Sequence, residues 1–226
     1  QQRYFSKLND KDLNVRAALT YKLADGFEGK SNVRLGYMGR FIKDGFEAVE
    51  YDMSVARQTI FDIGNVRFDS YYNQDNYADG MFLLDHYVES YDVKKNIHSA
   101  YAEATYQLTR RFTANLGLKY DNVDMKVGYN VNRNSTKGDQ EIKENYFLPS
   151  LNLRYDITED HALRLAASKT YTLPQSKEIS PYRYVSVSFK SQGNPYLKPS
   201  DNYNIDLKWD WYLSPSELLS IYRSEE

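Results

Sequence analysis

Cysteine is absent from the 226-residue sequence, and histidine is scarce. Without cysteine, the chain can form neither a disulfide framework nor a thiolate metal site. The three histidines, His86, His98 and His161, lack the i, i+3 or i+4 spacing of a metal site on a helix. The sequence therefore predicts neither a metal site nor a bound cofactor.

Long apolar runs and a strong net charge are also missing. No stretch approaches the roughly 20 apolar residues of a membrane-spanning helix, and residues 1–10, QQRYFSKLND, contain no apolar signal-peptide region. A formal net charge of −2 at pH 7 gives no overall attraction to nucleic acid or to anionic lipid. These absences exclude a helical membrane protein and argue against a nucleic-acid partner.

Apolar and polar residues alternate with a period of two along most of the chain. In residues 12–23, DLNVRAALTYKL, the odd positions are apolar and the even positions are mostly polar. The same pattern occupies residues 32–41, 97–120, 147–171 and 203–213, and a further strand begins near Leu218. The alternation predicts antiparallel hairpins. Strands of about 10 to 16 residues exceed those of most soluble sheets and suffice to cross a bilayer at a tilt.

Short and long connections alternate between the predicted strands. The turns at residues 109–111, 158–161 and 214–217 are tight, whereas polar, tyrosine-rich links cover residues 43–96, 128–143 and 174–202. Bacterial outer-membrane barrels combine short periplasmic turns with long extracellular loops. We therefore expect the three long links to be extracellular loops.

The second face of each predicted strand repeats Arg, Asp, Asn, Lys, Ser and Thr. A continuous polar face of this length is what a hydrated barrel lumen requires. Tyrosine is also abundant, with 22 residues, and aromatic side chains near strand ends fit the girdles at the two membrane interfaces. The predicted girdle residues are Tyr106, Phe112, Tyr120, Phe147, Tyr155, Tyr171, Tyr203 and Trp211.

Two irregularities interrupt this pattern. After Tyr120 the apolar residues Val123, Met125 and Val127 fall on the formerly polar face, which either a bulge or emergence from lipid near Asp121 would explain. Lys169 is a charge on an apolar face, but near a strand end its side chain can reach the interface.

The fold predicted from these features is all-β: an antiparallel transmembrane β-barrel. A sheet with open edges leaves backbone groups unpaired in lipid, and the sequence starts another strand at LLSIYRSEE, residues 218–226. We therefore interpret residues 1–226 as part of one outer-membrane barrel domain, contributing about 8–10 strands to a larger barrel.

Two segments carry a family resemblance. Residues 163–181, LRLAASKTYTLPQSKEISP, followed by residues 193–212, GNPYLKPSDNYNIDLKWDWY, resemble the barrel of TonB-dependent outer-membrane receptors. Residues 60–68 and 88–121 look like the preceding hairpin of that family, as found in Bacteroidetes. The motif residues are Pro174, Gly193, Asn194, Pro195, Leu197, Lys198 and Pro199, and we expect the prolines to stiffen this loop and Gly193 to permit a sharp turn.

The resemblance implies a 22-strand barrel in the bacterial outer membrane, with a plug domain that precedes residue 1. It also implies energised uptake, through a TonB complex, of a scarce small-molecule or peptide ligand: a siderophore or other metal chelate, a vitamin, a peptide or a glycan. Outer-membrane lipid and a surface lipoprotein are further implied partners. The absence of histidine between Leu173 and Asn194 argues against one haem-binding arrangement of the family, and Pro199 departs from the glycan-importing pattern.

Ligand capture is expected on the segment PYRYVSVSFK, residues 181–190. There Tyr182, Arg183, Tyr184 and Lys190 combine aromatic faces with cations that suit an anionic or conjugated ligand. On the polar strand faces, Arg154, Arg164 and Asp206 are further candidates, which could also simply pair with one another or with the plug.

Two alternatives share the same alternation. A passive outer-membrane pore or small structural barrel would lack a plug, and a soluble aromatic-rich binding module would purify without detergent. We find no convincing Ser/His/Asp or carboxylate arrangement, so the sequence does not predict an enzyme.

Overall fold

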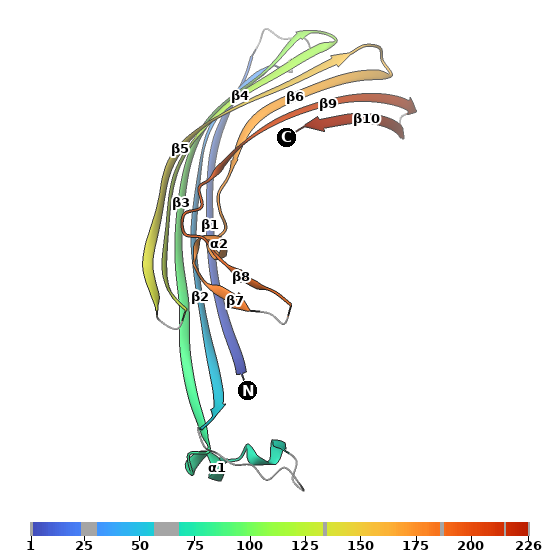
Figure 1. The fold of residues 1–226 in the computed structure, drawn as a ribbon. Helices are drawn as coiled ribbons and strands as arrows, with labels where there is room; N and C mark the ends of the chain where they lie inside the picture. Colours follow the sequence, from blue (N-terminus) through green and yellow to red (C-terminus); the bar gives the residue numbers. More distant parts are fainter. Residues whose placement is uncertain are drawn as a thin grey trace.

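The computed structural model of the protein describes residues 2–23, 31–56, 68–132, 135–185, 188–214 and 216–225. Eight strands form one antiparallel sheet in the order β1-β2-β3-β4-β5-β6-β9-β10. Their bounds are β1 Gln2–Lys22, β2 Asn32–Val55, β3 Phe82–Thr109, β4 Phe112–Val131, β5 Thr136–Asp156, β6 His161–Thr172, β9 Ser200–Ser214 and β10 Glu217–Glu225. Figure 1 shows this sheet as a single curved wall, and the predicted all-β antiparallel architecture is confirmed.

The remaining elements are short. A 3-10 helix (Phe68–Tyr71) and α1 (Gln74–Ala78) lie at the far end of the β2–β3 hairpin, while α2 (Ser176–Ile179), β7 (Arg183–Val185) and β8 (Lys190–Gln192) lie on the concave side of the wall (Figure 1). Across the described ranges, no helix has both the length and the hydropathy needed to span a membrane.

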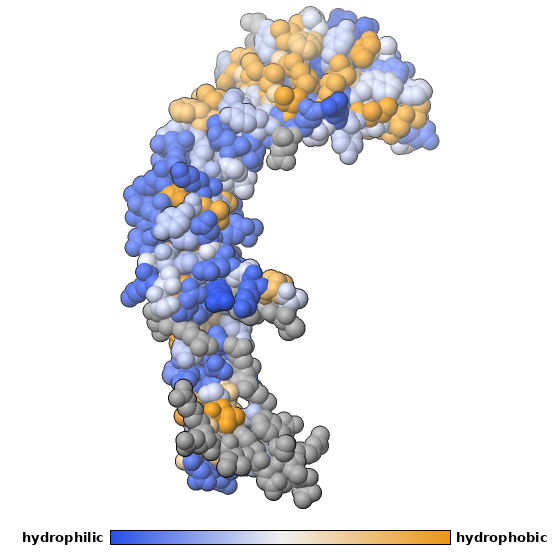
Figure 2. Space-filling view, viewed as in Figure 1, coloured by the Kyte–Doolittle hydropathy of each residue, from blue (hydrophilic) through white to orange (hydrophobic). Residues whose placement is uncertain are grey.

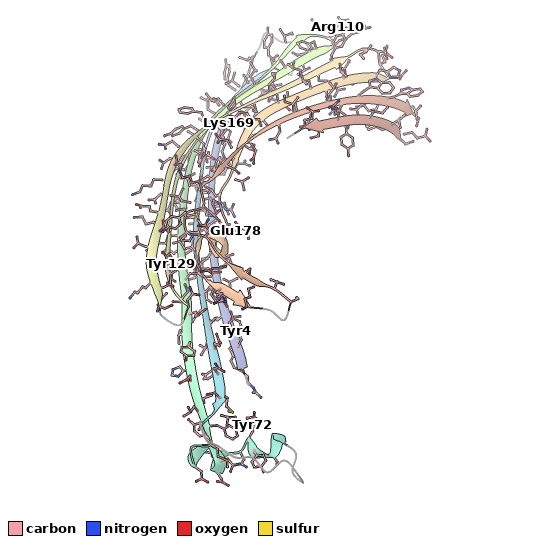
Figure 3. All side chains as sticks on the ribbon, viewed as in Figure 1. Tyr4, Tyr72, Arg110, Tyr129, Lys169 and Glu178 are labelled. Atoms are coloured by element: carbon pink, nitrogen blue, oxygen red, sulfur yellow. The ribbon has the colours of Figure 1, made fainter. Side chains whose placement is uncertain are left out.

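The tight turns gather at one end of the sheet, as predicted from the sequence. β3 and β4 meet at Thr109 and Phe112, and β5 and β6 meet at Asp156 and His161. Figure 3 places Arg110 at this end and Tyr72 at the opposite end of the molecule. We call the first the tight-turn end and the second the far end.

Apolar side chains lie in register across the convex face near the tight-turn end. One row joins Leu19, Leu35, Ala102 and Leu118 as successive cross-strand partners. Together these rows form what we call the lipid band, made of the outward residues within 13–21, 33–41, 100–108, 112–120, 147–157, 163–169 and 203–213. The lipid band extends for about 9–11 residues along these strands, except for β6, where it covers 7, and 9–11 residues are the length needed to cross a bilayer.

No second layer of described residues covers the lipid band. Leu116 is 57% exposed, Leu118 50% and Leu207 47%. Figure 2 shows hydrophobic residues gathered over the tight-turn end and hydrophilic residues over the middle of the wall. Since a soluble sheet would bury such a face against another layer, the exposed band is the surface expected to contact acyl chains.

Beyond the lipid band the apolar residues change to the inner, concave face. Val123, Met125 and Val127 of β4 are buried there, with Tyr91 and Val93 of β3 beside them. The pairing of β4 with β3 and with β5 continues without a shift through this region, so no bulge is present. The change of face instead marks the place where the outer surface passes from lipid to water.

The structure corrects the extent of two predicted loops. Residues 43–96 are largely strand, because β2 continues to Val55 and β3 begins at Phe82; in the link 128–143, β4 continues to Val131 and β5 begins at Thr136. Both pairs of strands extend past the lipid band as a sheet, and on its inner side Ala48, Tyr91, Val93, Met125 and Val127 are buried. Only the link 174–202 has largely the loop character that the sequence suggested.

Two further sequence expectations meet different outcomes. Tyr171 does not join the outer girdle: its ring stacks on Tyr146 of the inner face, with centroids 3.9 Å apart. Lys169 does lie at the edge of the lipid band, where its ammonium pairs with Asp201 at 2.9 Å and lies 5.4 Å from the Tyr203 ring centroid. The charge of Lys169 is therefore neutralised at the interface.

Candidate ligand-facing surface of the barrel wall

The inner face of the wall carries paired charges across the depth of the lipid band. Arg164 Nε lies 3.1 Å from Asp210 Oδ2, and Lys208 Nζ lies 3.0 Å from Asp210 Oδ1. Arg154 pairs with Asp156 at 2.9 Å. The predicted lumen residues Arg154, Arg164 and Asp206 line one shallow hollow, so the structure does bring them together on the inner face.

A buried carboxylate lies on this face at the edge of the lipid band nearer the far end. Asp121 is 1% exposed, and its Oδ2 atom accepts hydrogen bonds from Lys119 Nζ at 2.8 Å and from the Tyr171 hydroxyl at 2.9 Å. Because Tyr171 belongs to β6 and Asp121 to β4, this contact joins strands that are not neighbours in the sheet. Sequence reasoning missed it, since Tyr171 occupies an outward position in the alternation.

The link after β6 folds back onto the inner wall. Ile179 of α2 is buried against Tyr91, Val93, Met125 and Val127, which form the apolar cluster beyond the lipid band. The N-terminus of α2 is capped, because the Gln175 backbone N–H donates to the Glu178 carboxylate at 2.8 Å. Figure 3 shows Glu178 on the concave side, in front of the wall.

The motif beginning at Gly193 secures this folded link. The Gly193 N–H donates to the Tyr182 carbonyl at 3.2 Å, and the Asn194 N–H donates to the Glu178 carbonyl at 2.6 Å. A Cβ atom on Gly193 would lie 1.8 Å from the Ser180 carbonyl oxygen. Glycine is thus required at this position for close backbone contact with α2, although Gly193 has no positive φ.

Tyr182, one of the four predicted ligand residues, is held against the wall. Its side chain is buried, its hydroxyl lies 2.7 Å from that of Tyr4, and its ring meets Phe46 edge-on at 5.4 Å. Burial, followed by the hydrogen bond to Tyr4, raises the pKa of the Tyr182 phenol. The contacts that Tyr182 makes here therefore position the start of the β7–β8 hairpin.

The other three predicted ligand residues lie on that small hairpin. Arg183 pairs with Gln192 in register, and Val185 pairs with Lys190. The side chains of Arg183 and Lys190 are exposed. Tyr184 is paired with Ser191 through its backbone, and its side chain lies outside the described residues. The hairpin thus presents two cations on the concave side of the wall.

A carboxylate pair below α2 was not foreseen from the sequence. Asp44 of β2 faces Asp10 of β1 in register, and the Ser176 hydroxyl donates to Asp44 Oδ2 at 3.3 Å. Burial and the neighbouring Asp10 raise the pKa of the Asp44 carboxyl. Asp44 and Asp10 are only a pair, and nowhere in the described ranges do three His, Asp or Glu side chains come together as a possible metal site.

The geometry defines a class of protein: part of the wall of a membrane-spanning β-barrel, apolar outside and polar inside, with a folded loop on its inner face. The chain belongs to the TonB-dependent receptor-like β-barrel family, whose family model matches residues 1–221. The protein is accordingly placed in the outer membrane of Gram-negative bacteria, and the family recognised from the sequence is confirmed.

Solved structures of similar fold are receptors with low sequence identity. PiuA, a siderophore receptor from Acinetobacter baumannii, superposes with a TM-score of 0.60 at 11% identity over 96% of this chain and 32% of its own. FyuA, the ferric yersiniabactin uptake receptor from Yersinia pestis, superposes with a TM-score of 0.57 at 14% identity over 99% of this chain and 29% of its own. Fiu, the ferric-catecholate import receptor from E. coli K12, superposes with a TM-score of 0.56 at 14% identity, over 97% of this chain and 32% of its own.

The chain therefore spans about a third of the length of these receptors, and at such identities the similarity concerns the fold alone. No curated protein matches the sequence.

Proposed function

We propose that the chain forms part of the wall of a receptor that captures a small extracellular ligand and carries it across the outer membrane with energy from a TonB complex. The observation that carries the proposal is the polar inner face across the lipid band, together with the folded loop that docks on the inner face beyond the band. In this arrangement the tight-turn end faces the periplasm and the far end faces the outside. Coupling to TonB acts through a plug domain, and a surface lipoprotein stays a predicted partner.

Among the ligand classes open from the sequence, we propose a negatively charged metal chelate. Arg183 and Lys190 project from the hairpin, and aromatic side chains surround its base. Cations of this kind provide charge-assisted hydrogen bonds to anionic oxygens. The three receptors of similar fold are described as siderophore or ferric-chelate receptors, which adds an analogy. Tyr184 is a further proposed contact, while Tyr182 positions the hairpin.

Binding by the complete receptor tests the ligand class. Ferric enterobactin, a negatively charged ferric catecholate, is titrated into the purified receptor while tryptophan fluorescence is followed. The double variant Arg183→Ala/Lys190→Ala should bind about 10- to 100-fold more weakly, because two charge-assisted contacts are lost. The matched control Lys137→Ala/Lys143→Ala removes two cations from the outer face and should bind normally. Binding of cyanocobalamin or maltoheptaose, with none of the ferric chelate, would overturn the proposed class.

Uptake in whole cells tests the energised step separately. Accumulation of radioactive iron from the same chelate should stop when a protonophore removes the proton gradient. Accumulation that continues unchanged would indicate the passive pore and contradict the proposed function.

A further inference from the structure

Four lysines form one row on the outer face of the wall. Lys11 of β1, Lys43 of β2, Lys94 of β3 and Lys126 of β4 are successive cross-strand partners. Facing Cα atoms in an antiparallel sheet are about 4.5–5.5 Å apart. Like charges in facing positions destabilise a sheet, so the row is favourable only where counter-charges meet it.

The protein supplies a counter-charge at one end of this row only. Lys126 Nζ lies 2.7 Å from Glu141 Oε1, and Lys143 shares the same oxygen at 2.8 Å. Lys11, Lys43 and Lys94 are exposed, and no carboxylate among the described residues forms an ion pair with them. The nearest outward carboxylates are Asp92 of β3, one row farther from the lipid band, and Asp124 of β4, one row closer to it, and neither forms an ion pair with the three lysines. Within the described part of the chain, three adjacent ammonium groups are thus left without an ion-pair partner.

The position of the row relates Lys11 and Lys43 to the membrane directly, and Lys94 through its pairing with Lys43, since the lipid band on β3 ends at Ala100. The preceding row, two residues closer to the tight-turn end, contains Leu13 and Phe41, the last apolar pair of the lipid band on β1 and β2. Leu13 is 61% exposed. Two residues of strand correspond to about 7 Å, so a lysine stem can lie along the apolar surface while its ammonium reaches the headgroup region.

We propose that Lys11, Lys43 and Lys94 bind the phosphate groups of lipids in the outer leaflet. The row lies at headgroup depth, faces away from the lumen, and presents positive charge where lipid phosphates are concentrated. The proposal depends on the far end facing outward, but not on the identity of the transported ligand, since that ligand is bound on the opposite face.

Lipid retention by the complete receptor tests this site. The receptor is purified in a nonionic detergent, mixed with diphosphoryl lipid A or with the same lipid after enzymatic removal of its phosphates, and examined by native mass spectrometry. The intact receptor should bind the phosphorylated lipid preferentially, and less so at high salt, because screening weakens exposed charge contacts. The triple variant Lys11→Gln/Lys43→Gln/Lys94→Gln should lose roughly 100-fold in affinity, about fivefold for each lysine.

A matched triple variant controls for the change in net charge. Lys22→Gln/Lys137→Gln/Lys198→Gln removes three exposed lysines from other places and should retain lipid like the unmodified receptor. Equal retention of the phosphorylated and dephosphorylated lipids would overturn the proposal. So would unchanged affinity in the first triple variant, or an equal loss in the control. Heat-modifiable migration on gels verifies that all variants fold.

Discussion

At the scale of single residues, Gly193 shows why this position of the family motif requires glycine. Its backbone approaches the last turn of α2 so closely that an added Cβ would meet three carbonyl oxygens, those of Ser180, Glu178 and Lys177. Backbone atoms cannot rotate away as a side chain can. A substitution must therefore move either α2 or the start of the following strand.

Gly193→Ala should release the folded link from the wall. With α2 displaced, Ile179 leaves the apolar cluster and the Asn194 hydrogen bond to Glu178 is lost. We expect proteolytic cleavage within residues 174–199 of the complete receptor to become at least about tenfold faster, which corresponds to roughly 1.4 kcal/mol or more of local stability.

Gly128→Ala provides the matched control for this experiment. Gly128 lies in β4, and a Cβ at that position would meet no atom within 4 Å. The Gly128→Ala variant should be cleaved at the same sites and the same rate as the unmodified receptor. If Gly193→Ala were cleaved no faster than Gly128→Ala, close backbone contact would not be what secures the link.

At the scale of elements, the alternation predicted which residues form strands, but not how far the strands continue. The phase change at Val123 signalled that β4 leaves lipid, yet β2 and β3 also continue, to Val55 and from Phe82. On β4 the inner side is apolar there and the outer side carries Asp124 and Lys126, which reverses the pattern that identified the strands. On β2 and β3 both faces mix apolar and charged residues, so no clear alternation marks their continuation. The burial of Tyr182 was equally hidden, because it depends on Tyr4, which is 178 residues away in the sequence.

The docking of α2 should depend on pH through Asp44. Because the pKa of Asp44 is raised in the folded protein, its contribution favours the folded state at acidic pH and is lost as the pH rises through that raised value. At neutral pH the ionised Asp44 faces Asp10 below Ser176. Asp44→Asn removes this repulsion, while its amide oxygen can still accept the Ser176 hydrogen bond.

Hydrogen exchange of residues 174–182 measures this effect. At pH 7 we expect protection in Asp44→Asn to rise about two- to fivefold, a modest change because the carboxylate is partly solvated. Near pH 4 the difference should disappear. Asp92→Asn, which removes an outward carboxylate of β3, should change nothing at either pH. Lower protection in Asp44→Asn at pH 7 would show that the ionised carboxylate stabilises the docked helix.

At the scale of the whole molecule, eight strands form an arc with two open edges. β1 and β10 each pair on one side only. Eight strands of about 22 would be a little over a third of a receptor barrel, and the chain covers 29–32% of the length of the three receptors of similar fold. The two open edges need further strands beside them in the membrane, because unpaired backbone groups are costly in lipid.

This argument predicts that residues 1–226 produced alone will not insert as a stable monomer. Refolded into detergent micelles, the segment should show no heat-modifiable monomer on gels, whereas the complete receptor should. A heat-modifiable monomer of the segment alone would mean that eight strands close by themselves, as in the small structural barrel.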